Sequence, residues 1–432
     1  MRTKSSPRAG VKRRGFNMAK LFPHLPFVDH ETPMSWAGRL AAFHTHGPVL
    51  PFLNDLSIPM KDLAGGVHGA VERLCDMANQ DPEPVLRNAM RRRGDRRIDL
   101  RGEKVSAEFL TGLVTRFCPL CLLDDEKEHE RPQVTHRHRW TWMLQPVRTC
   151  PLHELALVER REGVWTDFAH ELAVIVPEVG AQLLQISKAQ EVREPSPLQG
   201  YAVERLEGQG GPSWLDQQSL EQAVRATEVL GAVIAFGSDA KASDVTSDGW
   251  DAAGRVAWPF VCRGETGVRD ALGLIGGASP SAKGGKPLRV RDFGMLYAWL
   301  SAPKLTKDPG PIRDVLRDHL VNTTDVMAGT KVLGKDITEP RLSSITSLAR
   351  SEKVHHLTLR KVLISRKLIP ADAEERSCSM TLVNYKVGRD LAAAMNRAVA
   401  FTALPEALNA SRPMCGSACN FDPCIGVIGV QK

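Results

Sequence analysis

The feature that most constrains the fold is a pair of matched short motifs, Cys118-Pro-Leu-Cys121 and Cys150-Pro-Leu-His153. In each motif, proline and a turn direct two metal-binding side chains toward the same point. Two such knuckles supply four soft or borderline ligands, which suits a closed tetrahedral Zn²⁺ site. A catalytic zinc ion more often keeps one position open. The motifs therefore predict a structural zinc ion bound by Cys118, Cys121, Cys150 and His153.

Two other interpretations of these motifs compete. The cysteines could pack in a core without metal, although matched knuckles of this kind rarely coincide. Alternatively, another histidine could replace His153 as the fourth ligand; the candidates are His129, His136 and His138. Those histidines lie in a charged stretch, whereas His153 has the knuckle spacing, so His153 is the preferred ligand.

Length and composition limit the class of protein. The 432 residues predict about three units at roughly 150 residues each, and 42% apolar residues suffice for folded cores. No run approaches the ~18 apolar residues of a membrane span. Nine cysteines, an odd number, without an export signal indicate a reducing cytoplasm rather than a disulfide scaffold. The net charge of +7 favours a polyanionic partner, and we expect a cytoplasmic, nucleoid-associated protein.

The predicted fold is mainly α and multidomain. Hydrophobic residues recur at helical spacing both before the zinc motifs and well after them. The expected segments are a disordered basic leader at 1–20, an N-terminal helical, helix-turn-helix-like domain at 21–115, a zinc-binding ribbon at 116–159, a linker or irregular layer at 160–218, a helical domain at 219–340, a helix-turn-helix domain at 341–411 and an irregular tail at 412–432. An alternative interpretation of the leader places the true start at Met18. Within the tail, Cys415, Cys419 and Cys424 could bind a metal but lack a knuckle pair.

Asp81-Pro82-Glu83 predicts a helix start, because it combines an N-cap, a proline at the first position and an acid near the positive end of the dipole. This helix is expected to end in the basic run 91–93, and two more arginines follow Gly94. Cations suit a helix C-terminus, but this density would equally form a phosphate-binding patch. Both interpretations stay open.

The segment between the knuckles interleaves basic and aromatic residues, His136-Arg-His-Arg-Trp140-Thr-Trp142. Trp140, Trp142 and Leu144 alternate with more polar residues, which predicts a strand with one buried face. Such a pattern can bind nucleic acid by charge and stacking. A zinc ribbon too small to build its own core more often uses tryptophans as cover, so we favour a structural role and keep the arginines as candidate contacts.

Residues 344–363 predict a helix-turn-helix. Leu348 and Ala349 would pack the first helix, and Lys353 occupies the turn position often held by glycine, which requires a left-handed backbone. The second helix would expose a basic surface suited to the major groove. The candidate nucleic-acid contacts are His355, His356, Thr358, Arg360, Lys361, Arg366 and Lys367. Such units also serve as protein contacts or purely structural elements.

Three of these features together resemble the TniQ family: the zinc pair, Trp140 with Trp142 ahead of the second knuckle, and the later helix-turn-helix. The likeness spans roughly 21–408 and is most specific over 117–155. The resemblance implies that the same four residues are the metal ligands.

The likeness reaches the sequence Met34-Ser-Trp36 with Arg39, which is similar to the family's opening, Glu-Ser-x-x-Ser-Trp-x-x-Arg. The acid and first serine of that opening are interpreted as shifted or lost, since the chain reads Glu31-Thr-Pro33 there. This part of the match is looser.

Members of the TniQ family are transposon target-selection proteins. The resemblance implies an adaptor, in some members a homodimer, that binds target DNA or a CRISPR-type ribonucleoprotein. It implies recruitment of an AAA+ ATPase regulator and, through it, the transposase complex. After Ser411 the sequence departs from the family's pattern, and this departure affects any last DNA-binding unit.

Proteins of other functional classes share some of these sequence features. The chain shows no nucleophile, acid or base at a recognisable spacing, so we expect no enzymatic activity. A zinc-containing helix-turn-helix transcription regulator shares most of these features and would bind promoter DNA without an ATPase. A subunit of an RNA-guided complex would instead show RNA-dependent binding with little affinity for DNA alone.

Overall fold

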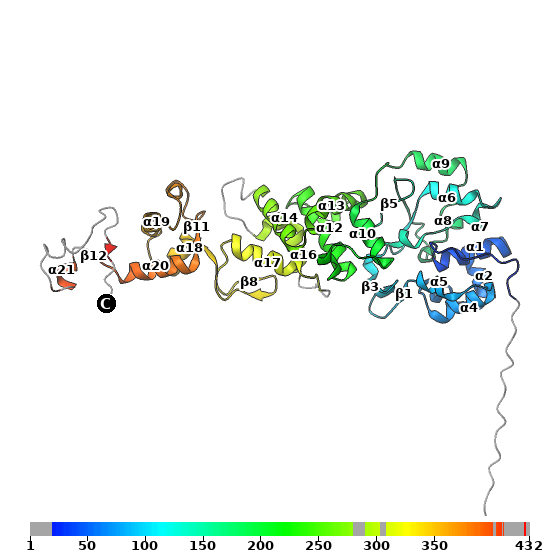
Figure 1. Cartoon of the computed structure of the whole chain (residues 1–432), viewed down its shortest axis with the longest axis horizontal. Helices are drawn as coiled ribbons and strands as arrows, with labels where there is room; N and C mark the ends of the chain where they lie inside the picture. Colours follow the sequence, from blue (N-terminus) through cyan, green and yellow to red (C-terminus); the bar gives the residue numbers. More distant parts are fainter. Residues whose placement is uncertain are drawn as a thin grey trace, which may run out of the picture. The chain divides into compact units, whose positions relative to one another are not determined.

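The computed structural model describes residues 20–279, 290–302, 308–400, 403–407, 409 and 427–428. The chain divides into two compact units, Met1–Pro195 and Ser196–Lys432 (Figure 1). The described residues are mainly helical with several small antiparallel sheets, which confirms the predicted fold class. Among the described helices, none has the length and apolar character needed to cross a membrane.

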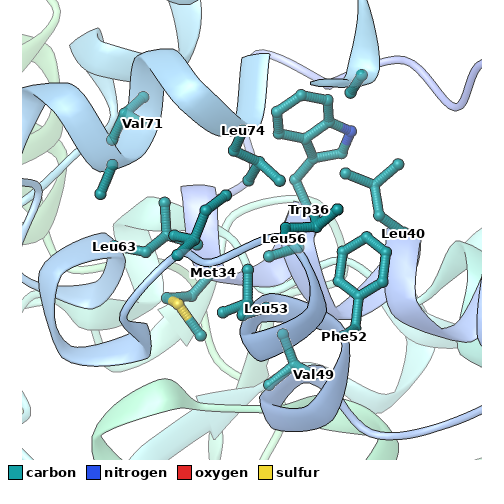
Figure 2. Packing of buried hydrophobic residues seen from close by; sticks show 14 of the residues in the cluster. Met34, Trp36, Leu40, Val49, Phe52, Leu53, Leu56, Leu63, Val71 and Leu74 are labelled. Carbon is teal, nitrogen blue, oxygen red and sulfur yellow. The ribbon is translucent and has the colours of Figure 1, made fainter. Parts of the chain in front are cut away.

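The first unit opens with five helices packed on one apolar core. They are α1 (Pro33–Thr45), α2 (Val49–Asp55), α3 (Met60–Ala64), α4 (His68–Ala78) and α5 (Pro82–Arg87). Figure 2 shows the labelled side chains of α1 to α4 directed into this common interior, where Trp36 and Leu74 are fully buried. Thr32 caps α1 by accepting a hydrogen bond from the Ser35 amide.

A buried ion pair fixes the start of α1. The Arg39 guanidinium lies 2.6 Å from a Glu31 carboxylate oxygen, and the two side chains are 4% and 0% exposed. The Ser35 hydroxyl also donates to Glu31, and Arg39 Nε donates to the Val134 carbonyl 2.8 Å away. The bond to Val134 joins α1 to a segment about a hundred residues later in the chain.

The helix predicted at Asp81-Pro82-Glu83 is present, with Asp81 as its N-cap. Its predicted basic end is wrong, because α5 ends at Arg87. The buried Asn88 side chain donates hydrogen bonds to the carbonyls of Asp29 and Glu31, which precede α1. These bonds favour a chain direction after Asn88 that does not continue α5. The arginines that follow lie instead in an antiparallel sheet, β1 (Arg91–Arg92), β2 (Arg97–Leu100) and β3 (Glu103–Ser106).

The remainder of the first unit contains short elements around the two cysteine motifs. Strand β4 (Thr115–Phe117) pairs with β7 (Val158–Arg160), and β5 (Thr149–Cys150) pairs with β6 (Leu155–Ala156). The helices and 3₁₀ turns of this region are η1 (Ala107–Phe109), α6 (Pro119–Glu126), α7 (Pro132–Thr135), η2 (Trp140–Met143), η3 (Asp167–Ala169), α8 (Leu172–Ile175) and α9 (Ala181–Lys188).

The predicted strand through the two tryptophans is wrong, because this segment is the 3₁₀ turn η2. Both tryptophans are buried, but against different neighbours: Arg101 lies over the Trp140 ring, and the His138 ring meets the Trp142 ring edge-on. The alternating pattern therefore reflects burial on two sides of a turn. Strand-like bridges occur on either side of this turn, from Arg139 to Glu31 and from Leu144 to Leu110.

The second unit begins with a helical layer. Its elements are α10 (Pro197–Leu206), α11 (Ser213–Asp216), α12 (Leu220–Phe236), η4 (Ala242–Asp244), α13 (Ser247–Val261), α14 (Gly264–Ala278), η5 (Val290–Phe293), α16 (Gly294–Ser301) and α17 (Ile312–Thr323). A capping box formed by Ser219 and Gln222 starts α12. Helices α12 and α13 pack closely at Gly231, where a Cβ atom would lie 1.9 Å from the Ala253 carbonyl oxygen.

The same unit ends with a small domain that holds the helix-turn-helix. Before it, the hairpin of β8 (Lys331–Val332) and β9 (Lys335–Asp336) is held to α17 by Arg317, which donates to the Val332 and Leu333 carbonyls. The elements of the small domain are β10 (Leu342–Ser344), α18 (Ile345–Ser351), α19 (His356–Ser365), η6 (Ala371–Glu374), β11 (Leu382–Asn384) and α20 (Tyr385–Arg397). Strands β10 and β11 pair and carry α18 and α20 to one core, where Gly388 lets α20 approach Leu348. Short elements follow at β12 (Val399–Ala400), α21 (Leu404–Ala407) and β13 (Val427–Ile428). The three tail cysteines, Cys415, Cys419 and Cys424, lie outside the described residues.

Candidate metal centre and nucleic-acid interface

Local structure places the four predicted ligands on two short turns. Cys118 is the N-cap of α6 and Cys121 lies in its first turn, because Pro119 is favoured at the first helical position. Cys150 ends β5, and His153 lies in the tight turn that leads into β6. All three cysteines are buried and His153 is partly buried.

The structure brings the four side chains into one cluster, with their ligand atoms all within 4.8 Å of one another. His153 Nδ1 lies 3.4 Å from Cys121 Sγ and 3.6 Å from the sulfur atoms of Cys118 and Cys150. The Sγ atoms of Cys121 and Cys150 are 3.5 Å apart, far beyond the ~2.05 Å of a disulfide bond. This cluster could hold a metal ion. The other candidate histidines, His129, His136 and His138, do not belong to it.

The electrostatics of the cluster favour a cation. Hydrogen bonding to the neighbouring thiols Cys118 and Cys150, with burial, raises the pKa of Cys121 well above its ordinary value. Thiolates this close together repel one another, and a bound cation would remove that repulsion.

A carboxylate that the sequence analysis missed supports the histidine ligand. Asp124 Oδ2 lies 3.0 Å from His153 Nε2, the ring nitrogen on the far side from the cluster. A bond from Lys127, 2.7 Å away, is the largest influence that lowers the pKa of Asp124. Metal-binding histidines almost always donate their second ring N–H to such a group, which fixes the tautomer and ring orientation. The sequence signal that could have identified Asp124 is its position one helical turn after the ligand Cys121.

The interleaved basic segment between the knuckles lies inside the unit. Arg137 is buried and pairs with Asp125 at 2.8 Å and with Glu128. His136 contacts Glu126, and His138 Nε2 lies 3.1 Å from the Arg116 carbonyl oxygen. Arg139, half-buried, lies over the Trp142 ring. These contacts favour the structural role over nucleic-acid binding for this segment.

Two histidines stack beneath this segment. The rings of His138 and His170 are 5.2 Å apart and nearly parallel. Burial lowers the pKa of His170 to about 4 and lowers the pKa of His138 well below its ordinary value. Both rings are therefore neutral near pH 7, which removes charge repulsion from the stack.

Most of the predicted nucleic-acid contacts in the helix-turn-helix are exposed to solvent. Leu359, Val362 and Leu363 form the inward face of α19. The exposed predicted residues are His355, His356, Thr358, Lys361, Arg366 and Lys367. Lys353 takes the left-handed backbone that its turn position requires, with φ of 55°.

Arg360 differs from the other predicted contacts because it is half-buried. Its Nη1 donates to the Arg376 carbonyl 3.0 Å away, in the segment that follows η6. The bond directs one side of the guanidinium toward the protein, and Arg360 therefore contributes to the packing of α19 as well as to its basic surface.

Comparisons with known proteins agree with part of the sequence analysis. Residues 22–157 match the family model described as TniQ, which confirms the predicted resemblance over that segment. The match encloses all four cluster residues and the Glu31–Arg39 pair, while the helix-turn-helix lies beyond it. No curated protein matches the chain.

The opening of the matched segment corrects one interpretation. Glu31 is not shifted, because it contacts both Ser35 and Arg39, the serine and arginine of the opening motif. Thr32 replaces the motif's first serine and serves as the N-cap of α1, a role for which either hydroxyl is suited.

Proposed function

We propose that this chain, which carries a TniQ domain at residues 22–157, acts as a target-selection adaptor in DNA transposition. The family match is the observation that carries the proposal. The adaptor would bind target DNA or an RNA-guided complex and recruit an AAA+ ATPase regulator and the transposase. It would select and recruit without catalysing the strand transfer.

The cluster of Cys118, Cys121, Cys150 and His153 is proposed to bind Zn²⁺. Zinc bonds of about 2.3 Å to sulfur and 2.0–2.1 Å to nitrogen, at tetrahedral angles, separate two sulfurs by about 3.8 Å and sulfur from nitrogen by about 3.6 Å. The observed separations of 3.4–3.6 Å between sulfur and nitrogen and of 3.5 Å between two sulfurs support this assignment.

The zinc ion is proposed to be structural. Four protein ligands would fill a tetrahedral shell and leave no position for water or substrate. The ligands come from α6 and from the β5–β6 hairpin, so the ion would join these two segments beside the pairing of β4 with β7. Asp124 would orient His153 for this purpose.

The exposed face of α19 is the proposed nucleic-acid contact. Lys361, Arg366 and Lys367 supply charge for the phosphate backbone, and Thr358 with the two histidines lies where a recognition helix meets base edges. Arg360 keeps free donors for a base or a phosphate beside its bond to Arg376. A basic, exposed helix on an apolar support is what recognition by a helix-turn-helix requires.

Affinity purification of the full chain from its native cells, with and without nuclease, tests the adaptor role. The proposal expects an AAA+ ATPase to remain bound after nuclease treatment, because the contact is between proteins. Recovery of DNA alone, with no ATPase or transposase, would contradict the proposal.

That second result would favour a zinc-containing helix-turn-helix transcription regulator. The specific observation behind this alternative is the exposed basic face of α19, which lies outside the segment matched by the TniQ model. A regulator would bind promoter DNA through α19 without a partner ATPase. A purified chain that bound only in the presence of RNA would instead indicate a subunit of an RNA-guided complex.

A further inference from the structure

An arginine-lined pocket in the first unit takes no part in the metal centre. The hairpin β1–β2 supplies one side of it with Arg92, Arg93, Arg96 and Arg97. Its volume is about 310 Å³, near the lower end of the ~300–1,000 Å³ of ligand pockets. Of the described residues that line the pocket, none is acidic.

The inner wall of the pocket is apolar. It is formed by Met90, Ile98, Leu110, Met143 and Phe168. A smaller cavity of about 30 Å³ shares part of this wall and reaches the core of α1 and α3 at Met34 and Leu63. The pocket thus combines a cationic rim with an apolar interior. A ligand that fills it must carry both an anionic group and an apolar group.

His170 lies where the two cavities meet. It lines both of them and is 4% exposed. Its Nδ1 lies 2.9 Å from the Thr115 hydroxyl, which fixes the ring. Burial lowers the pKa of His170 to about 4, although a backbone hydrogen bond at Gly112 acts in the opposite direction. The imidazole is therefore a fixed, neutral part of the wall, and the arginines and the apolar side chains determine what the pocket can bind.

The arginines of the rim lie on and beside a tight turn. Asp95 and Arg96 both have left-handed backbones in the tight turn between β1 and β2, with φ of 57° and 58°. Arg93 pairs with Asp99 at 2.6 Å and Arg96 pairs with Glu108 at 2.8 Å, and all four side chains remain at least partly exposed. The exposed Arg92 has no ion pair within the described residues.

We propose that this pocket binds an acidic protein segment that carries a large apolar side chain. The side chain would enter the apolar interior, and flanking carboxylates would pair with the arginines of the rim, where Asp99 and Glu108 already show that geometry. This occupant would dock a partner of the adaptor on its TniQ domain. The inference deepens the proposed function, on which its biological role rests.

Nucleic acid fits the pocket less well. Sequence-tolerant binding of single strands uses exposed aromatic platforms along an open groove. Here the single aromatic wall residue, Phe168, is half-buried, and the pocket is a hollow bounded on several sides by aliphatic side chains. The basic run 91–97 is therefore assigned to a protein carboxylate rather than to the phosphate patch that its sequence suggested.

Fluorescence anisotropy with short labelled peptides tests this proposal on the purified full chain. The probe is Asp-Asp-Phe-Glu-Glu, and the matched peptide replaces its phenylalanine with alanine. We expect the phenylalanine peptide to bind, and the alanine peptide to bind at least about tenfold more weakly, because it leaves the apolar interior unfilled. No binding of the phenylalanine peptide, or equal binding of the two, would overturn the proposal.

Matched variants locate the site. Arg92→Ala/Arg96→Ala should weaken binding of the phenylalanine peptide at least about tenfold, since charge-assisted hydrogen bonds are lost. Arg91→Ala should leave binding unchanged, because Arg91 is exposed beside the rim but does not line the pocket. Equal loss in both variants would indicate general charge attraction and overturn the proposal.

A labelled single-stranded oligonucleotide of equal charge completes the test. If the oligonucleotide displaces the peptide and loses more affinity than the peptide in Arg92→Ala/Arg96→Ala, the site is for nucleic acid and the proposal fails. Peptide binding requires neither ATPase nor target DNA. Failure of this inference and failure of the adaptor role are therefore separate results.

Discussion

Two basic regions of the molecule, the segment between the cysteine motifs and helix α19, use their cations in opposite ways. In the first, Arg137 is buried and bonded to the carboxylates of Asp125 and Glu128 in the same unit. In the second, Lys361 and Lys367 are exposed on the outer face of the helix. The density of basic residues is similar, but the central arginine of the first region is buried whereas the lysines of α19 lie at the surface.

The two regions also differ in what holds them together. The helix-turn-helix packs around an apolar core of α18, α19, β11 and α20. The cysteine region has short strands, many buried polar groups and the metal-ligand cluster. The first kind of core is stabilised by apolar burial, and the second depends on specific bonds that a single substitution can remove.

The largest expected effect is loss of the metal centre. Cys121→Ser should release the metal and unfold residues 115–160, since structural zinc binding contributes about 10–16 kcal/mol in small zinc domains. Hydrogen exchange measured by mass spectrometry should show lost amide protection there and unchanged protection in α18–α20. Cys262→Ser, at an exposed cysteine of the second unit, is the control. Its amide protection should equal that of the unsubstituted chain. Parent-like protection in Cys121→Ser would show that the cluster does not stabilise the region.

The second largest effect on stability is expected at the buried ion pair of Arg39 and Glu31. Arg39→Met would leave the Glu31 carboxylate buried and unpaired, which costs about 3–5 kcal/mol. Denaturant unfolding of the full chain should show this loss in the transition of the first unit. Arg87→Met, on the exposed side of α5, should change stability by less than about 0.5 kcal/mol. Equal effects of the two variants would contradict a special role for the pair.

Acid should destabilise the first unit through the histidine stack. The pKa of His170 is about 4 in the folded chain and 6.5 when unperturbed, so the unfolded state binds more protons between these values. The contribution of His170 to the free energy of unfolding is fully present above pH 6.5. It falls by up to about 3 kcal/mol as the pH is lowered to 4. Unfolding followed from pH 7.5 to 4 should show a shallower dependence in His170→Gln. An identical slope would exclude His170 as a source of acid sensitivity.

The smallest effects are expected on the exposed face of α19. Arg360→Ala should weaken specific DNA binding by about 1–3 kcal/mol if the side chain reads a base. Lys361→Ala and Lys367→Ala should weaken binding to all sequences and each reduce the salt dependence by about one ion. Lys386→Ala, an exposed lysine on α20, is the matched control for a titration at several salt concentrations. A loss of DNA affinity in Lys386→Ala as large as in the α19 variants would contradict the proposed role of α19.

Sequence patterns predicted the parts of the molecule in which a few residues at fixed spacing determine the geometry. The cysteine knuckles place their ligands within three residues of each other, and the turn at Lys353 follows from the spacing of two apolar helices. Each of these features depends on local geometry, so the sequence contains most of the information.

Features that depend on distant contacts were missed. The basic run after α5 was predicted as a helix end, but Asn88 bonds to residues before α1 and redirects the chain into a hairpin. The tryptophan segment was predicted as a strand, because alternation does not distinguish a strand from a turn buried on two sides. The pocket beside the hairpin also needs residues from 64 to 170, which no local pattern joins.

The central claim is that a metal ion bound by Cys118, Cys121, Cys150 and His153 organises the cysteine region of the segment that matches the TniQ model. Elemental analysis of the purified full chain by mass spectrometry, before and after dialysis against a chelator, tests it most directly. The account predicts one equivalent of zinc per chain, and loss of folded structure in the first unit when the metal is removed. A chain that is free of metal and unfolds at the same temperature as before dialysis would contradict it.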